Sequence, residues 1–109
     1  MLTRASQWPA ICLTAIAMLV PVQPLRAADA DNGKQLSLQW CASCHLVSND
    51  QQVGTSDSQP TFYDLAADRS WDEASLKTFL ADPHPKMPDM ALTPRETADI
   101  ARYIDSLQP

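Results

Sequence analysis

The clearest helical pattern lies near the carboxyl end, where the apolar side chains Ile100, Tyr103, Ile104 and Leu107 recur every three or four residues. This spacing places all four on one face of a helix. The Thr-Pro-Arg-Glu run at residues 93–96 is a capping box with proline at the first helical position, a combination typical of a helix start. The sequence therefore predicts a helix that begins after residue 93 and buries this apolar face.

Weaker patterns predict three further helices. Asp31 is suited to cap a first helix that contains Leu36 and Trp40 and runs into the cysteine-containing segment after it. Phe62 and Leu65 predict a second, short helix. A Ser-Trp-Asp-Glu run at residues 70–73 has the pattern of another capping box. It precedes the apolar positions of a third helix, Leu76, Phe79 and Leu80.

Two stretches between these helices lack helical patterns. Residues 47–59 are mostly Ser, Asn, Asp, Gln and Gly, so we expect a solvated loop that Pro60 closes. Residues 82–92 contain prolines, which lack an amide donor and restrict the residue before them. These prolines are Pro83, Pro85 and Pro88. The second stretch is therefore predicted to be an extended loop.

Composition supports an all-α fold of a single small domain. The chain has 109 residues, 45% of them hydrophobic and 6% aromatic, which excludes large enzyme architectures. It contains two glycines and nine prolines. Strands and hairpins usually need more glycine and more β-branched residues than this, whereas helices joined by stiff turns do not.

The charge is acidic. Eight Lys and Arg against thirteen Asp and Glu give a formal net charge of −5, which argues against nucleic acid as a partner because phosphates must be neutralised by a basic face. Asp64, Asp68, Asp72 and Glu73 form an acidic run that is most simply a solvated face. The same run would suit electrostatic steering of a basic partner.

The first residues have the pattern of an export signal. Arg4 precedes an apolar run from Ala10 to Val20, which is shorter than the roughly 20 residues of a membrane-spanning helix. We predict that residues 1–27 are a secretion signal peptide cleaved after Ala27, with Ala30 as the alternative site. Residues 28–109 then form the mature domain in the periplasm, with no membrane-spanning segment.

The strongest chemical signal is Cys41-Ala42-Ser43-Cys44-His45, a C-x-x-C-H run that is typical of c-type haem attachment. Two cysteines three positions apart at a helix end face the same side, so each sulfur can form a thioether with one haem vinyl group. His45 is then held beneath the iron as its proximal ligand. A covalent haem would also supply the apolar body that such a short chain lacks.

Three other interpretations of this run are weaker. A thioredoxin-like redox pair belongs near a βαβ pattern, which is absent around Cys41. A zinc site would have to combine Cys41, Cys44, His45 and His84, but adjacent Cys and His residues rarely bind one tetrahedral ion together. A chance match is the third. The absence of any other cysteine in residues 28–109 favours haem attachment.

Over the predicted mature chain the sequence resembles the class I cytochromes c. Gly33 lies where such proteins place the glycine that lets the first and last helices cross closely, and Ile100 and Tyr103 resemble the partner face. Pro60 resembles the family proline whose carbonyl accepts the proton of the proximal imidazole, here His45. The resemblance implies a cytochrome c-like fold of three to four helices around one covalent haem.

One position departs from the family pattern. Family members often carry an aromatic residue four positions before the first haem cysteine, where this chain has Ser37. We expect Leu36 or Trp40 to supply the missing packing. The other aromatic side chains are expected in the core rather than in an electron-relay path, because aromatics dominate small cores. They are Phe62, Trp71, Phe79 and Tyr103.

The second axial ligand of the iron is predicted to be Met87. Pro85 and Pro88 bracket it in a stiff loop, and it resembles the methionine of the family's ligand loop. Met90 and His84 are the alternatives. Met90 lies closer to the predicted helix start at residue 93, and the simplest interpretation of His84 is a surface imidazole.

These residues predict a periplasmic one-electron carrier that is not itself an enzyme. Its cofactor is one haem c with iron, and its partners are redox proteins with a basic docking patch. The alternative is a small haem c subunit of a periplasmic dehydrogenase or oxidase complex. A gas-binding sensor would need an open iron and would therefore not use Met87 as a ligand.

Overall fold

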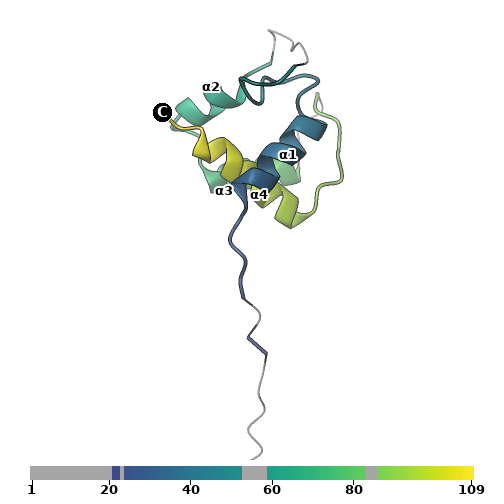
Figure 1. Ribbon diagram of the computed structural model, residues 1–109, viewed down its shortest axis with the longest axis vertical. Helices are drawn as coiled ribbons and strands as arrows, with labels where there is room; N and C mark the ends of the chain where they lie inside the picture. The colour runs from purple at the N-terminus through teal and green to yellow at the C-terminus, as the bar shows by residue number, and fades with distance from the viewer. Residues whose placement is uncertain (1–20, 23, 53–58, 83–85) are drawn as a thin grey trace, which may run out of the picture.

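The computed structural model describes residues 21, 22, 24–52, 59–82 and 86–109. Within these ranges the chain forms four helices and no strand: α1 (Ala30–Trp40), α2 (Phe62–Ala67), α3 (Glu73–Ala81) and α4 (Pro94–Ser106). The helices gather into one body, and the described segment before α1 extends away from it (Figure 1). The predicted all-α fold is confirmed. None of the helices in these ranges is long and apolar enough to cross a membrane.

The start of α4 is the capping box that the sequence predicts. The Thr93 hydroxyl accepts a hydrogen bond from the backbone N–H of Glu96, and the Glu96 carboxylate accepts one from the N–H of Thr93. These hydrogen bonds favour the ionised carboxylate and lower the pKa of Glu96. The cap thus satisfies amide groups that the first turn of a helix leaves unpaired.

We expect Thr93→Ala to lower the free energy of unfolding by about 1 kcal/mol, because the variant loses the side chain that caps α4. Chemical denaturation of the parent and the variant measures this difference. Thr78→Ala is a control: Thr78 is exposed within α3, and its hydroxyl donates to the carbonyl of Ala74 in the preceding turn. An equal loss in both variants would contradict a specific capping role for Thr93.

The predicted caps of two other helices were wrong by two residues. The residue that caps α1 is Asp29, whose side chain accepts hydrogen bonds from the N–H groups of Asp31 and Asn32; Asp31 itself lies in the first turn. The capping box of α3 pairs Asp72 with Ser75, while Ser70 bonds to Asp68 in the preceding turn.

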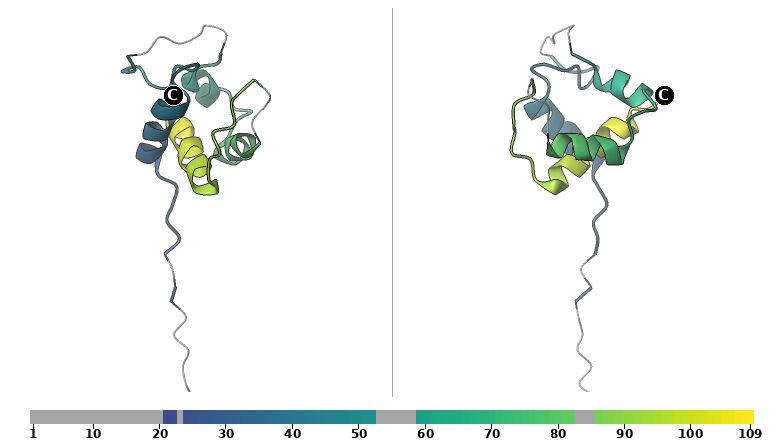
Figure 2. Two further views of the ribbon diagram at one scale, coloured as in Figure 1. Left: turned by 90° about the vertical axis from the view of Figure 1, so that its right-hand side faces the viewer. Right: turned by 180° about the vertical axis from the view of Figure 1, so that it is seen from behind.

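The first and last helices cross at Gly33, as expected (Figure 2, left). A Cβ atom on Gly33 would lie 1.9 Å from the carbonyl oxygen of Asp99 and 2.9 Å from Cβ of Tyr103. The nearest neighbours are therefore Asp99 and Tyr103 rather than Ile100, which is fully buried in the core. Only a residue without a side chain fits between the two helices at this distance.

The Asp99 carboxylate joins the same two helices. It is 1% exposed, and it accepts hydrogen bonds of 2.8 Å from the Asp29 backbone N–H and 2.8 Å from the Asn32 side-chain amide. A buried carboxylate is costly unless it is hydrogen-bonded, and here both oxygens have donors. This pairing fixes the start of α1 against α4.

At the position of the missing aromatic residue, the Ser37 side chain is fully buried and its hydroxyl donates to the Gly33 carbonyl at 2.7 Å. Leu36 is partly buried against the core, whereas Trp40 is 44% exposed. Of the two residues expected to supply packing, Leu36 therefore contacts the core more fully.

The predicted loop after residue 46 is packed at its start, which corrects the expectation that it is solvated throughout. Val47 is fully buried, Ser48 is 6% exposed, and the Val47 carbonyl accepts a 2.9 Å hydrogen bond from the Tyr103 hydroxyl. Residues 53–58 lie outside the described ranges. Val47 thus extends the core, because its neighbour on α4 supplies both apolar contact and a hydrogen-bond donor.

The loop before α4 agrees with the prediction where it is described. Helix α3 ends at Ala81, and residues 86–92 form no helix. Pro83, His84 and Pro85 lie outside the described ranges, so the expectation for His84 is not tested.

Candidate functional site

The C-x-x-C-H run is a turn that continues directly from α1. Cys41 is the C-cap of α1, and its carbonyl accepts hydrogen bonds from the N–H groups of Cys44 at 3.1 Å and His45 at 2.9 Å. Cys41 is buried and Cys44 is exposed. Both thiols are free and are not joined in a disulfide. The turn therefore leaves both sulfurs available for bonds to another group.

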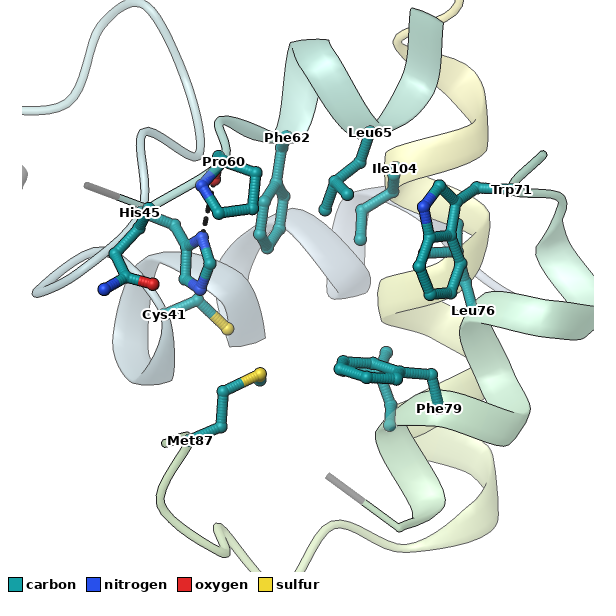
Figure 3. Close-up of a pocket in the computed structure, with 12 residues that line it drawn as sticks. Cys41, His45, Pro60, Phe62, Leu65, Trp71, Leu76, Phe79, Met87 and Ile104 are labelled. Carbon is teal, nitrogen blue, oxygen red and sulfur yellow. Dashed lines mark hydrogen bonds between the residues drawn. The ribbon is translucent and has the colours of Figure 1, made fainter. Parts of the chain in front are cut away.

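The His45 ring is held in one orientation by the chain that follows. Its Nδ1 atom lies 2.7 Å from the Pro60 carbonyl oxygen, drawn as a dashed line in Figure 3. A carbonyl only accepts, so Nδ1 carries the hydrogen and donates it, and in the neutral imidazole Nε2 is the nitrogen with the lone pair. The Phe62 ring packs beside the imidazole at a centroid distance of 5.7 Å. His45 is thus prepared to bind a metal through Nε2.

A cavity of about 270 Å³ lies beside this ring. Its walls come from the C-x-x-C-H turn, α2, α3, α4 and the loop that carries Met87 (Figure 3). The lining side chains are almost all apolar: Cys41, His45, Gln59, Pro60, Phe62, Leu65, Trp71, Leu76, Phe79, Leu80, Met87 and Ile104. Such a wall excludes water and suits a large apolar ligand.

Met87 lies on the side of this cavity formed by the loop before α4, and its sulfur is directed into the space that Cys41 and His45 also line (Figure 3). Met90 does not line this cavity. It borders a smaller adjoining hollow of about 60 Å³ together with Trp40, Cys44 and Met87. His45 and Cys41 border both spaces, so the structure places Met87 at the larger apolar cavity as well as at the smaller hollow, and Met90 at the smaller hollow alone.

Sequence reasoning missed part of the cavity wall. Trp71 and Phe79 were expected only as core residues, but they are half-buried, pack edge to face at 5.4 Å and line the cavity. Gln59, assigned to a solvated loop, lines it as well. The position of Gln59 directly before Pro60 was the one sign in the sequence that it lies near the haem site. The buried pair Phe62 and Tyr103, at 6.4 Å, does belong to the core as expected.

The geometry does not favour the alternative uses of the cysteines. Burial and the nearby Cys44 raise the pKa of Cys41 to about 11, whereas a reactive dithiol needs a thiol whose pKa is lowered. Within the described ranges, no three His, Cys, Asp or Glu side chains are placed to hold a metal ion together. His84, the remaining residue of the zinc alternative, lies outside those ranges.

Comparisons with known proteins show the family of the chain. Residues 28–104 match the family model described as "Cytochrome C oxidase, cbb3-type, subunit III". The chain is also 44% identical to cytochrome c-552 of Bradyrhizobium diazoefficiens over 99 residues. The matched region covers 91% of this chain and 93% of that relative. The chain belongs to this cytochrome c family. No solved structure matches it.

Membership in the family makes this a c-type cytochrome, which carries electrons on a covalently bound haem c and is not an enzyme. The residues present fit that group. The described site combines two free thiols in one turn, an imidazole whose Nδ1 is hydrogen-bonded to a carbonyl, and a thioether at an apolar cavity. These are the donor types that c-type haem requires.

Proposed function

We propose that Cys41 and Cys44 carry the haem thioethers, that His45 is the proximal iron ligand, and that Met87 is the distal one. The observation that carries this proposal is the apolar cavity of about 270 Å³ that Cys41, His45 and Met87 line together. Pro60 acts on the ligand rather than on the iron: its carbonyl holds the Nδ1 proton of His45 and so leaves Nε2 as the ligating atom.

The arrangement suits rapid one-electron transfer. The bound haem supplies the Fe(III)/Fe(II) couple. A thioether ligand favours the reduced state, so a histidine and methionine pair raises the potential. The Pro60 carbonyl fixes the imidazole, and Phe62, Phe79 and the leucines exclude water from the cavity. Because the ligands are held in place by the fold, little rearrangement accompanies the change of oxidation state.

We further propose that residues 1–27 are removed on export and that the cytochrome domain, residues 28–109, acts in the periplasm. The short apolar run from Ala10 to Val20 supports this proposal. So does the segment before α1, where Val22 is 92% exposed and Leu25 is fully exposed. Neither side chain packs on the helical body, so the fold loses no packing contact of Val22 or Leu25 when they are removed.

The mass of the intact protein from a periplasmic extract tests attachment and processing together. We expect a chain that starts at Ala28 and carries the mass of one haem after denaturation in acid and acetone, because thioethers survive conditions that strip other haems. Cys41→Ala and Cys44→Ala together should give the same chain without haem. Loss of haem from the denatured parent protein would contradict covalent attachment. A start at Asp31 would show instead that cleavage follows Ala30.

A second candidate is a haem c subunit of a periplasmic oxidase or dehydrogenase complex. The description of the matching family, which names an oxidase subunit, favours it. The match to cytochrome c-552 over 93% of that relative favours the free carrier. Purification from membranes without added salt discriminates between them, because a subunit remains with a larger redox chain and a free carrier does not.

We propose a basic docking patch on the redox partner, supported by the acidic charge of the mature domain. The signal peptide contains two arginines and no acid, so its removal changes the formal charge from −5 to −7. The acidic run also has local roles: Asp64 completes the capping box of α2, Asp72 caps α3, and Glu73 pairs with Arg102 at 3.1 Å. Steering of a partner thus comes from the overall charge as well as from this run.

A further inference from the structure

One side chain outside the cavity organises the backbone around His45. The Gln51 carbonyl oxygen accepts hydrogen bonds from the backbone N–H groups of Val47 at 2.8 Å and Ser48 at 3.3 Å. Its amide nitrogen donates to the carbonyl oxygens of Ala42 at 3.3 Å and His45 at 3.2 Å. A single amide thus bonds four main-chain groups on both sides of His45.

These groups lie in a segment that no regular structure supports. Helix α1 ends at Trp40 and α2 begins at Phe62, so residues 42–48 make no continuous helical hydrogen bonds. Val47 and Ser48 are buried, and buried main-chain groups need partners. Gln51 provides these partners and closes the turn into a compact loop, with both ends of its amide used.

The contacts divide the support of His45 between two places. Gln51 holds the main-chain carbonyl of His45, while the Pro60 carbonyl holds its ring at Nδ1. The Phe62 N–H also donates to the carbonyl of the next residue, Leu46, at 2.9 Å. With the backbone and the ring fixed separately, the direction of the Nε2 lone pair into the cavity is determined. Without Gln51, the His45 carbonyl would lose its bond, and the backbone here would keep only the hydrogen bonds from the His45 N–H to Cys41 and from the Phe62 N–H to Leu46.

We propose that Gln51 is a positioning residue for the proximal ligand: its side-chain amide holds the His45 backbone so that the ring keeps both the Pro60 hydrogen bond and its direction toward the iron. This inference rests on the proposed ligation by His45. It gives the polar segment after the C-x-x-C-H run a role in orienting the ligand. Groups that bond to metal ligands commonly orient them in this way.

The test compares Gln51→Leu, which loses all four hydrogen bonds, with Gln51→Glu, which at neutral pH keeps the acceptor and loses both donors. Gln52→Leu and Gln52→Glu are matched controls, because Gln52 is the exposed next residue. Nuclear magnetic resonance of the haem-loaded protein measures solvent exchange of the His45 Nδ1 proton in the reduced state. In the oxidised state it measures the paramagnetic shifts of the His45 ring.

We expect the Nδ1 proton to exchange about tenfold faster in both Gln51 variants, the effect of losing roughly one hydrogen bond of ordinary net strength. The paramagnetic shifts of the ring should change in the same variants, while the amides of α4 exchange as in the parent. The Gln52 variants should match the parent in all three measurements. If Gln51→Leu does not fold, Gln51→Glu carries the test, because it retains the bonds to Val47 and Ser48.

Two results would overturn the inference. In one, the Gln51 variants give His45 signals equal to those of the Gln52 variants. In the other, the α4 amides accelerate as much as the His45 proton, which would show a general loss of stability. Failure of the proposed ligation is a separate result, since the parent protein itself would then show no paramagnetically shifted His45 resonance.

Discussion

Met87→Ala is expected to abolish the far-red sulfur-to-iron absorption band, to let carbon monoxide bind the reduced iron and to lower the potential by on the order of 0.1 V. The sulfur of Met87 is directed into the cavity that His45 also lines, so its removal takes away the proposed distal ligand (Figure 3). Axial ligands set haem potentials over a range of about 0.8 V, which makes such a shift modest for a ligand loss. Visible spectra and a redox titration measure all three effects.

Met90→Ala is the matched control for this prediction. Met90 is half-buried in the same loop but borders the smaller hollow outside the main cavity, so the band and the potential should change little. If Met90→Ala alone lost the band, the assignment of the distal sulfur would be wrong. If the parent protein itself showed no such band, the distal ligand would not be a sulfur, and His84 would become the candidate to test next.

Local patterns predicted the parts of this molecule that local chemistry decides. The C-x-x-C-H run needs only its own spacing to place Cys41, Cys44 and His45 in one turn. The cap of α4 likewise needs only Thr93 and Glu96, which bond to each other across one helical turn. In both cases the interacting groups lie within four residues, so few alternatives compete.

The caps of α1 and α3 were mispredicted because several neighbouring residues cap helices equally well. Asp29 and Asp31 have the same side chain, and the choice between them depends on a distant residue: the Asp29 N–H donates to Asp99 on α4. The same limit applied at α3, where Ser70 and Asp72 are both good capping residues. Helix boundaries set by tertiary contacts cannot be obtained from capping preferences alone.

The loop after residue 46 and the cavity wall show a second limit of prediction from the sequence. Polar composition suggested that residues 47–59 are solvated, yet Val47 is fully buried and Gln51 bonds the backbone beside His45. A glutamine that satisfies main-chain groups looks the same in a sequence as one that faces water. Similarly, Trp71 and Phe79 carry no mark that separates a core aromatic from one that lines a cofactor cavity. Whether an aromatic side chain lines a cofactor cavity depends on the shape of the bound group, and the spacing of these residues in the sequence does not give that shape.

Gly33→Val is expected to lower the thermal midpoint by roughly 5–20 °C, because overpacking costs about 1–3 kcal/mol and each kcal/mol shifts a domain of this size by about 4–8 °C. The new Cβ would meet the Asp99 carbonyl oxygen at 1.9 Å. That oxygen belongs to the backbone of α4, so no side-chain rotation relieves the clash and the helices must separate. Thermal unfolding followed by circular dichroism measures the midpoint.

The same separation should reach the haem site while leaving its covalent bonds intact. Helix α1 ends in the C-x-x-C-H turn and α4 contributes Ile104 to the cavity wall, so moving one helix from the other loosens the cavity. The bond to Met87 should weaken first, because a loop rather than a helix carries that ligand. Gln35→Val is the control because it places the same β-branched residue at an exposed position of α1. If Gly33→Val has the same thermal midpoint as Gln35→Val and keeps the far-red band, the close approach at Gly33 does not support the haem site. A fall in both the midpoint and the band, with the haem still attached after denaturation, would show that the crossing of the terminal helices holds the distal ligand in place.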